Sequence, residues 1–120
     1  FLHRDIKPDN IQVRASDGSL VLLDFGSAGQ AAGVASDGLV VVTPGYAPIE
    51  QYGIGEQGPW TDLYALGATL YWCVSGRKPP DAETRKADPR AYSRAVEAGR
   101  DVFGDAFLKA IDWALATDPA

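Results

Sequence analysis

Four polar side chains with complementary chemistry lie at the two ends of a short segment near the N-terminus. Asp5, Lys7 and Asn10 precede this segment, and Asp24 follows it directly. The segment itself, residues 11–23, is expected to form a β-hairpin, which brings its two ends together. Carboxylate and amide oxygens are the ligands that Mg²⁺ prefers, with phosphate oxygens completing its shell. An ammonium group can neutralise a phosphoryl group in transfer, and a second carboxylate can accept a proton from an attacking hydroxyl. The spacing therefore predicts a phosphoryl-transfer site at the open end of the hairpin.

The hairpin is predicted from alternation and turn chemistry. Residues 11–14 alternate between apolar and polar side chains, and residues 20–23 form a short apolar run. Between them, residues 15–19 contain an Asp-Gly pair that tolerates positive φ. Residues 24–38 are rich in Gly, Ala and Ser, which predicts a long functional loop, and a short strand is expected over 39–42.

Three helices are expected in the second half of the chain. The first spans 61–75, with Thr61 as its N-cap and Gly76 at its end, and its apolar side chains cover nearly all faces, which is typical of a buried central helix. The second spans 88–98, starting from an Asp-Pro pair. The third spans 105–118, and together these elements predict a single α+β domain that is mainly helical. The buried face expected for the third helix consists of Phe107, Leu108, Ile111 and Leu115.

Composition limits the class of protein. The chain has 120 residues, of which 46% are hydrophobic and 22% charged, as in one soluble globular domain. Its longest apolar run, around 65–74, is too short to cross a membrane. The net charge of −5 argues against nucleic acid or an anionic membrane as the main partner. A single cysteine, Cys73, fits a reducing compartment and is expected to be a small core residue. Residues 77–80 are expected to form a solvated turn, and a less favoured alternative places them near the substrate groove. The three tryptophans, Trp60, Trp72 and Trp113, are expected to pack in the core or at an interface.

The motifs around the four polar side chains resemble those of protein kinases. Residues 3–10, His-Arg-Asp-Ile-Lys-Pro-Asp-Asn, are similar to the kinase catalytic loop, and residues 24–26, Asp-Phe-Gly, are similar to the magnesium-binding motif of that family. The resemblance implies the fold of the kinase large lobe, with ATP and Mg²⁺ (or Mn²⁺) as cofactors. The implied roles are catalytic base for Asp5, contact with the γ-phosphate for Lys7, and metal binding for Asn10 and Asp24.

A second segment, residues 43–50, reads Thr-Pro-Gly-Tyr-Ala-Pro-Ile-Glu and resembles the end of the kinase activation loop. The family usually closes this segment with Ala-Pro-Glu, so the chain departs from the pattern but keeps the carboxylate of Glu50. In the family that Glu pairs with an Arg, which would follow Ala120 here, so Glu50 is expected to be unpaired. Lys7 and Thr43 both match the serine/threonine form, in which Thr43 hydrogen-bonds the catalytic Asp and Lys and favours a Ser or Thr substrate.

The resemblance also implies supporting roles. The stretch Asp-Leu-Tyr-Ala-Leu-Gly that begins at Asp62 is similar to the start of the central helix of the large lobe, where the Asp accepts backbone N–H bonds from the turn formed by His3 and Arg4. His3 is expected to pack inward and orient the turn at residues 24–26. Arg4 is typical of kinases whose active loop is held by a phosphate, and Ser36 is the best candidate acceptor for that phosphate.

The sequence is interpreted as part of a longer kinase domain. It contains no methionine and begins two residues before His3, whereas the Gly-rich strands, the strand Lys and the helix Glu that position ATP would precede Phe1. Residues 1–120 would then run from the catalytic loop through the penultimate helix of the large lobe. The favoured function is an ATP-dependent serine/threonine protein kinase of bacterial type that acts on protein substrates in the cytoplasm, with or without a membrane tether elsewhere in the parent.

Two other functions stay open. A pseudokinase or scaffold would bind without catalysis, and the loss of the phosphate-positioning Lys upstream would favour it. A small-molecule kinase of related fold is less favoured, because such enzymes lack a substrate-peptide segment like residues 43–50.

Overall fold

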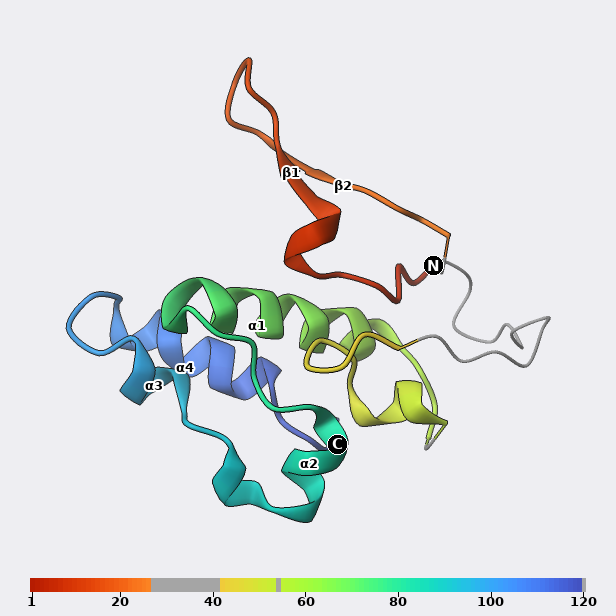
Figure 1. Ribbon diagram of the computed structural model, residues 1–120, viewed down its shortest axis with the longest axis vertical. Coiled ribbons are helices and arrows are strands. Elements are labelled where there is room, and N and C mark those ends of the chain that lie inside the picture. The colour runs from red at the N-terminus through yellow and green to blue at the C-terminus, as the bar shows by residue number, and fades with distance from the viewer. Residues whose placement is uncertain (27–41, 54, 120) are drawn as a thin grey trace.

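The computed structural model describes residues 1–26, 42–53 and 55–119 (Figure 1). A two-stranded hairpin projects from one side of a helical part, and the N-terminus lies at the base of this hairpin. Residues 39–41 of the strand expected over 39–42 lie outside the described residues, as do most of the loop expected over 24–38 and Ser36. Within the described ranges, no helix has the length and apolarity needed to cross a membrane.

The hairpin has the geometry that its turn residues favour. Strands β1 (Ile11–Val13) and β2 (Leu20–Leu22) pair in antiparallel fashion, as predicted. Gly18 adopts φ of +73°, a left-handed conformation that is costly for residues with a Cβ. The carboxylate of Asp17 accepts hydrogen bonds from the backbone N–H and the hydroxyl of Ser19, at 3.0 and 2.7 Å. Local chemistry therefore closes this turn without help from the rest of the chain.

The strand pairing continues past β1 and β2 toward the polar residues. The short 3-10 helix η1 (Pro8–Asn10) leads directly into β1. The backbone N–H of Leu23 donates to the carbonyl of Asn10 at 2.7 Å. This bond sets Asn10 beside Leu23, one residue before Asp24, so the hairpin brings the two motifs together.

Helix α1 (Pro59–Ser75) begins two residues earlier than predicted. Its N-cap is Gly58, because Pro59 has a φ suited to the first helical position and needs no hydrogen-bond acceptor. Thr61 is therefore not the N-cap; its hydroxyl oxygen accepts from the backbone N–H of Gly58 at 3.1 Å. The helix ends as predicted at Gly76, which has φ of +77°.

The prediction that α1 is buried on every side is wrong. Tyr64, Ala68 and Tyr71 are buried, whereas Leu63 is 50% exposed and Leu66 is 41% exposed. The described helices cover one face of α1 only, so apolar residues on its other face contact solvent. Cys73, which was expected to lie in the core, is exposed as well. The core alternative also fails for the three tryptophans, which are exposed: Trp60, Trp72 and Trp113.

The helix predicted over 88–98 is split into separate short elements. A six-residue helix that was not predicted, α2 (Ala82–Ala87), precedes them. The Asp88-Pro89 pair starts only a short 3-10 helix, η3 (Pro89–Ala91). Helix α3 (Ala95–Ala98) begins after an extended stretch. The N-terminus of α3 is capped by Asp112, whose carboxylate accepts from the backbone N–H groups of its first two residues at 2.7 and 3.1 Å. A cap that comes from a distant residue leaves no local signal.

Helix α4 (Asp105–Ala114) packs against α1 and forms the core with it. It begins where predicted and ends at Leu115 rather than near 118. Gly67 lets the two helices approach closely, because a Cβ there would lie 2.9 Å from the Cβ of Ala114. Phe107 is 43% exposed and does not belong to the buried face. The core cluster comprises Tyr64, Ala68, Tyr71, Ala95, Leu108, Ile111 and Leu115.

Candidate active site

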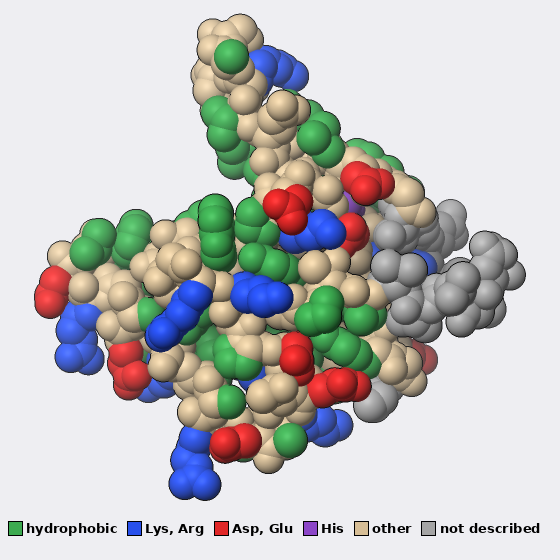
Figure 2. Space-filling model, in the orientation of Figure 1, with side chains coloured by type: hydrophobic (Ala, Val, Ile, Leu, Met, Phe, Trp, Pro, Cys, Tyr) green, Lys and Arg blue, Asp and Glu red, His purple; other side chains and the backbone are tan. Residues whose placement is uncertain are grey.

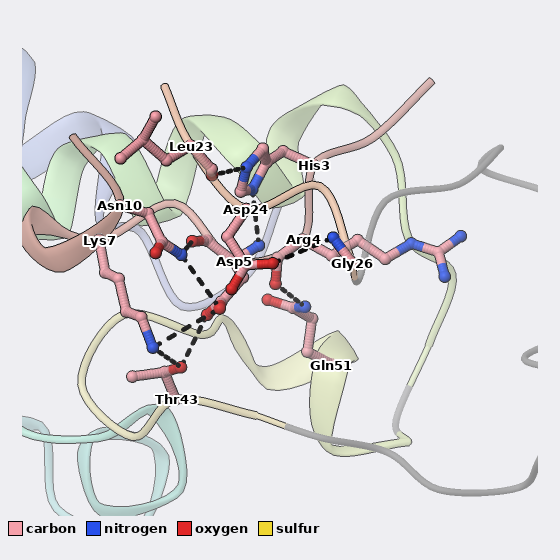
Figure 3. A network of polar contacts seen from close by, with 10 residues as sticks. All are labelled: His3, Arg4, Asp5, Lys7, Asn10, Leu23, Asp24, Gly26, Thr43 and Gln51. Atoms are coloured by element: carbon pink, nitrogen blue, oxygen red, sulfur yellow. Dashed lines mark hydrogen bonds and ion pairs between the residues drawn. The ribbon is translucent and has the colours of Figure 1, made fainter. Parts of the chain in front are cut away.

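The carboxylate of Asp5 lies at the centre of a polar network at the base of the hairpin (Figure 3). Its Oδ1 accepts from the Thr43 hydroxyl at 2.8 Å, and its Oδ2 accepts from the Asn10 amide at 3.2 Å. The Lys7 ammonium lies 3.5 Å from Oδ2 and donates to Thr43 Oγ1 at 3.3 Å. The side chains of Asp5 and Lys7 keep about a fifth of their surface exposed, at 20% and 22%. The network therefore joins a carboxylate, a cation and a hydroxyl at a site that substrate can reach.

Charged side chains of both signs gather where the hairpin meets the helical part, as Figure 2 shows. The two predicted constellations, 3–10 and 43–50, meet at this junction although they are more than 30 residues apart. The structure thus gives Thr43 the hydrogen bonds that the kinase resemblance implies for it.

Asp62, in the first turn of α1, holds the turn that precedes Asp5. Its two carboxylate oxygens accept from the backbone N–H groups of His3 and Arg4, at 2.8 and 2.9 Å. Arg4 has φ of +69°, which is uncommon and strained for a residue with a Cβ. The Gln51 amide donates to the Arg4 carbonyl at 2.9 Å. Gln51 was not singled out in the sequence, because nothing local to it indicates a bond to residue 4.

His3 connects this turn to the Asp-Phe-Gly turn. The imidazole is buried, and its Nδ1 accepts from the backbone N–H of Asp5 at 3.2 Å. The proton is then on Nε2, which donates to the Leu23 carbonyl at 2.9 Å. The ring also contacts the edge of Phe25, with 4.9 Å between ring centroids. His3 thus packs inward against the turn at residues 24–26.

Asn10 and Asp24 are the candidate metal ligands. The buried Asn10 side chain donates from Nδ2 to the Asp5 carbonyl at 2.8 Å, which leaves its amide oxygen for a cation. Asp24 is exposed, has φ of +57° and accepts at Oδ1 from the backbone N–H of Gly26 at 3.2 Å. Among the described residues, no three His, Cys, Asp or Glu side chains form a metal-binding group. One amide and one carboxylate suit a hard cation whose other ligands are phosphate oxygens, and the convergence of their oxygens stays a prediction.

Glu50 is buried and has a hydrogen-bond partner that the motif pattern does not indicate. It lies in the 3-10 helix η2 (Ile49–Tyr52), and its Oε1 accepts from the Thr61 hydroxyl at 2.9 Å. Within the described part of the chain, no cation forms an ion pair with it. Glu50 is therefore hydrogen-bonded, although it lacks the ion pair that the family pattern implies.

The solvated turn expected at residues 77–80 is partly buried. Pro79 is fully buried, and the Lys78 ammonium lies 3.4 Å from the Pro44 carbonyl. A groove of about 490 Å³ is lined by Pro44, Gly45, Lys78 and Pro79, among others. Pro44 follows Thr43 directly in sequence. The turn therefore forms a wall next to the candidate site.

Comparison with known proteins identifies the class. Residues 1–117 match the Protein kinase domain family, and the chain belongs to that family. It is 41% identical over 91 residues to "Serine/threonine-protein kinase PknA" of Nostoc sp., which covers 70% of this chain and 16% of the relative. It is 34% identical over 126 residues to "Serine/threonine-protein kinase C" of Synechocystis sp., which covers 99% of this chain and 23% of the relative.

A solved structure described as "PpkA-294 apo form" has the same arrangement, with a TM-score of 0.80 and 43% sequence identity. The match covers 99% of this chain and 41% of that chain. The fold is therefore that of the kinase large lobe, in which the described residues form a hairpin and four α-helices. The chain spans less than a quarter of the length of the two curated relatives named above.

Proposed function

We propose that the protein containing this chain is an ATP-dependent serine/threonine protein kinase that transfers the γ-phosphate to protein hydroxyls. The contact of Asp5 with Thr43 and Lys7 carries this proposal, because it places a proton acceptor and a cation side by side. The names of the relatives support the same chemistry.

The geometry distinguishes the two oxygens of Asp5. Oδ1 receives a short hydrogen bond from Thr43, whereas the contacts of Oδ2 with Asn10 and Lys7 are longer, at 3.2 and 3.5 Å. Oδ2 is therefore the atom better placed to accept the proton of a substrate hydroxyl. Lys7 lies close enough to this oxygen to stabilise negative charge on a phosphoryl group that reacts beside it.

Asn10 and Asp24 would hold the metal ion. The amide oxygen of Asn10 and the carboxylate of Asp24 are hard oxygen donors, which fit Mg²⁺ or Mn²⁺. Such an ion supplies charge neutralisation to the phosphates of ATP. The hairpin bond between Leu23 and Asn10 keeps these two ligand residues at neighbouring positions.

The groove beside Thr43 supports a protein substrate over a small molecule. Its lining includes residues 44–45 as well as Lys78 and Pro79. Gly45 lies at φ of +92°, and a Cβ there would come within 2.9 Å of the Lys78 side chain. A groove lined by Pro44 and Gly45, which follow Thr43 directly in sequence, is suited to an extended peptide.

We also propose that residues 1–120 are one part of the kinase domain and that the isolated chain has no kinase activity. Catalysis in this class consists mostly of positioning and charge stabilisation. The chain contains none of the Gly-rich strands that cover the ATP phosphates, so it would not hold the γ-phosphate in line with the acceptor.

Phosphate transfer by the whole protein tests the proposal. We expect Asp5→Asn to lower the rate of ³²P transfer from ATP to a generic protein substrate by about 10²–10⁴-fold, the usual contribution of a catalytic base. Asp9→Asn is the matched control, because Asp9 is an exposed acid of the same loop, and we expect it to stay near the wild-type rate. A folded wild-type protein that binds ATP without transferring phosphate would refute the proposal and favour a scaffold.

A further inference from the structure

Arg85 of α2 is a buried cation that has no anionic partner among the described residues. Only 6% of the surface of Arg85 is exposed. Nη1 donates to the Tyr64 hydroxyl at 2.8 Å, and the guanidinium carbon lies 4.1 Å from the centroid of the Tyr92 ring. Nε is buried with no hydrogen-bond partner, and no carboxylate of the described residues forms an ion pair with Arg85. Burying an unpaired charge is unfavourable, so this arrangement calls for an acceptor.

Asp112, the nearby acid, is committed elsewhere. Its Oδ1 accepts from the Tyr92 hydroxyl at 2.5 Å and from the Ala95 N–H at 2.7 Å, and its Oδ2 accepts from the Val96 N–H at 3.1 Å. Burial and the adjacent Asp112 raise the pKa of Tyr92, so its hydroxyl keeps the proton that it donates. Asp112 therefore caps α3 and holds Tyr92 beneath Arg85 rather than neutralising it.

A cavity of about 720 Å³ adjoins this guanidinium, between α2, η3 and α4. Arg85, Lys86, Arg94 and Lys109 line it, and Asp112 is the only acid among its described lining residues. Trp113, which also lines it, is 77% exposed. A cavity with a cationic lining is unexpected on a chain with a net charge of −5, and an exposed indole beside cations is typical of peptide-binding surfaces.

We propose that this cavity, named here the Arg85 cavity, binds a carboxylate or phosphate group on a polypeptide segment. The oxyanion would pair with Arg85 and Lys86, and an apolar side chain next to it would pack on Trp113. The guanidinium fork offers several N–H donors in one plane, which match the two oxygens of such a group. The inference stands apart from the proposed kinase activity, because the cavity shares no lining residue with the Asp5 network.

Peptide binding to the whole protein, without ATP, tests this inference. The probes are three fluorescent peptides of one design, in which leucines flank a pair of glutamates, phosphoserines or glutamines. We expect fluorescence anisotropy to show binding of the glutamate or the phosphoserine peptide, and about tenfold weaker binding of the glutamine peptide. The tighter of the two anionic peptides shows which oxyanion the cavity takes.

Three variants locate the binding. Arg85→Met keeps an unbranched apolar side chain and should weaken binding by about tenfold or more, because it removes the buried partner of the oxyanion. Arg90→Met removes the same charge from η3, where the side chain is 96% exposed and outside the cavity, and should leave affinity within about twofold. Lys86 also lines the cavity but is exposed, so Lys86→Met should not disturb folding. It should weaken binding measurably even if Arg85→Met does not fold.

Two results would overturn the inference. One is equal weakening by Arg90→Met and the cavity variants, which would show attraction by overall charge alone. The other is failure of both anionic peptides to bind the folded wild-type protein, which would show that the Arg85 cation needs no external oxyanion.

Discussion

Asp62→Ala should damage the catalytic turn more than the helix to which Asp62 belongs. The carboxylate accepts from His3 and Arg4 at 2.8 and 2.9 Å, across 59 and 58 residues of sequence. Removing it leaves two partly buried backbone donors without an acceptor, at about 1–3 kcal/mol each. The loss of a negative charge at the N-terminus of α1 costs only about 0.3–1 kcal/mol. The larger cost therefore falls on the turn before Asp5.

The strain at Arg4 adds to this expectation. Two hydrogen bonds hold its backbone at φ of +69°: its N–H donates to the Asp62 carboxylate, and its carbonyl accepts from the Gln51 amide. A loss of about 2 kcal/mol lowers the population of the correct turn about 30-fold relative to relaxed conformations. We expect kcat of the whole kinase to fall by up to this factor, which is reached when relaxed conformations of the turn predominate in the variant, whereas KM for ATP should change much less.

Steady-state kinetics and chemical denaturation, measured on the same variants, test the reasoning. Asp105→Ala is the matched control, because Asp105 is an exposed acid in the first turn of α4 and pairs with the exposed Lys109 of the same helix. Its free energy of unfolding should fall by less than about 1 kcal/mol, and its kcat should not change. An Asp62→Ala enzyme with wild-type kcat would refute the role of Asp62 in the turn. A loss of activity that matches the unfolded fraction would refute it as well.

Other predictions concern single contacts. Thr43→Val keeps the shape of the side chain but removes the donor to Asp5 Oδ1; kcat/KM for a peptide substrate should fall, while the free energy of unfolding changes by only about 0.5–1.5 kcal/mol. Gly67→Val should destabilise the fold by about 1–3 kcal/mol in calorimetry, because a Cβ there already lies 2.9 Å from Ala114. The N–H of Thr84 lowers the pKa of Asp81 below the ordinary 3.8. The stability from this N-cap should therefore be complete above the ordinary pKa and lost as pH falls through the lowered one, so stability curves of wild type and Asp81→Ser should converge in acid.

Local chemistry was enough to predict several elements. The Asp-Gly pair closes the hairpin, Gly76 ends α1 in a left-handed conformation, and α4 begins at Asp105. The motif segments also lie together as the resemblance implied. In each case the residues that determine the structure are neighbours in sequence or belong to a recognisable motif.

The errors concern features that depend on distant residues. The split of the predicted helix at 88–98 depends on Asp112, which caps α3 from α4. Helix α2 has six residues, too few to show a helical period. Leu63 and Leu66 are apolar but exposed. The apolar pattern of a helix therefore shows which of its faces could pack, but it does not show which face another element covers.

The first turn of α1 explains why two motifs so far apart in sequence reach one site. Thr61 holds Glu50 at the end of the segment that begins with Thr43, and Asp62 holds the turn before Asp5. Because these two anchors are adjacent on one rigid helix, the segments keep their relative positions. A displacement of this turn would move both segments together and leave the bond between Thr43 and Asp5 in place. The first turn of α1, which Gly58 and Pro59 start at a defined residue, thus helps to set the separation between the Asp5 carboxylate and the Thr43 hydroxyl.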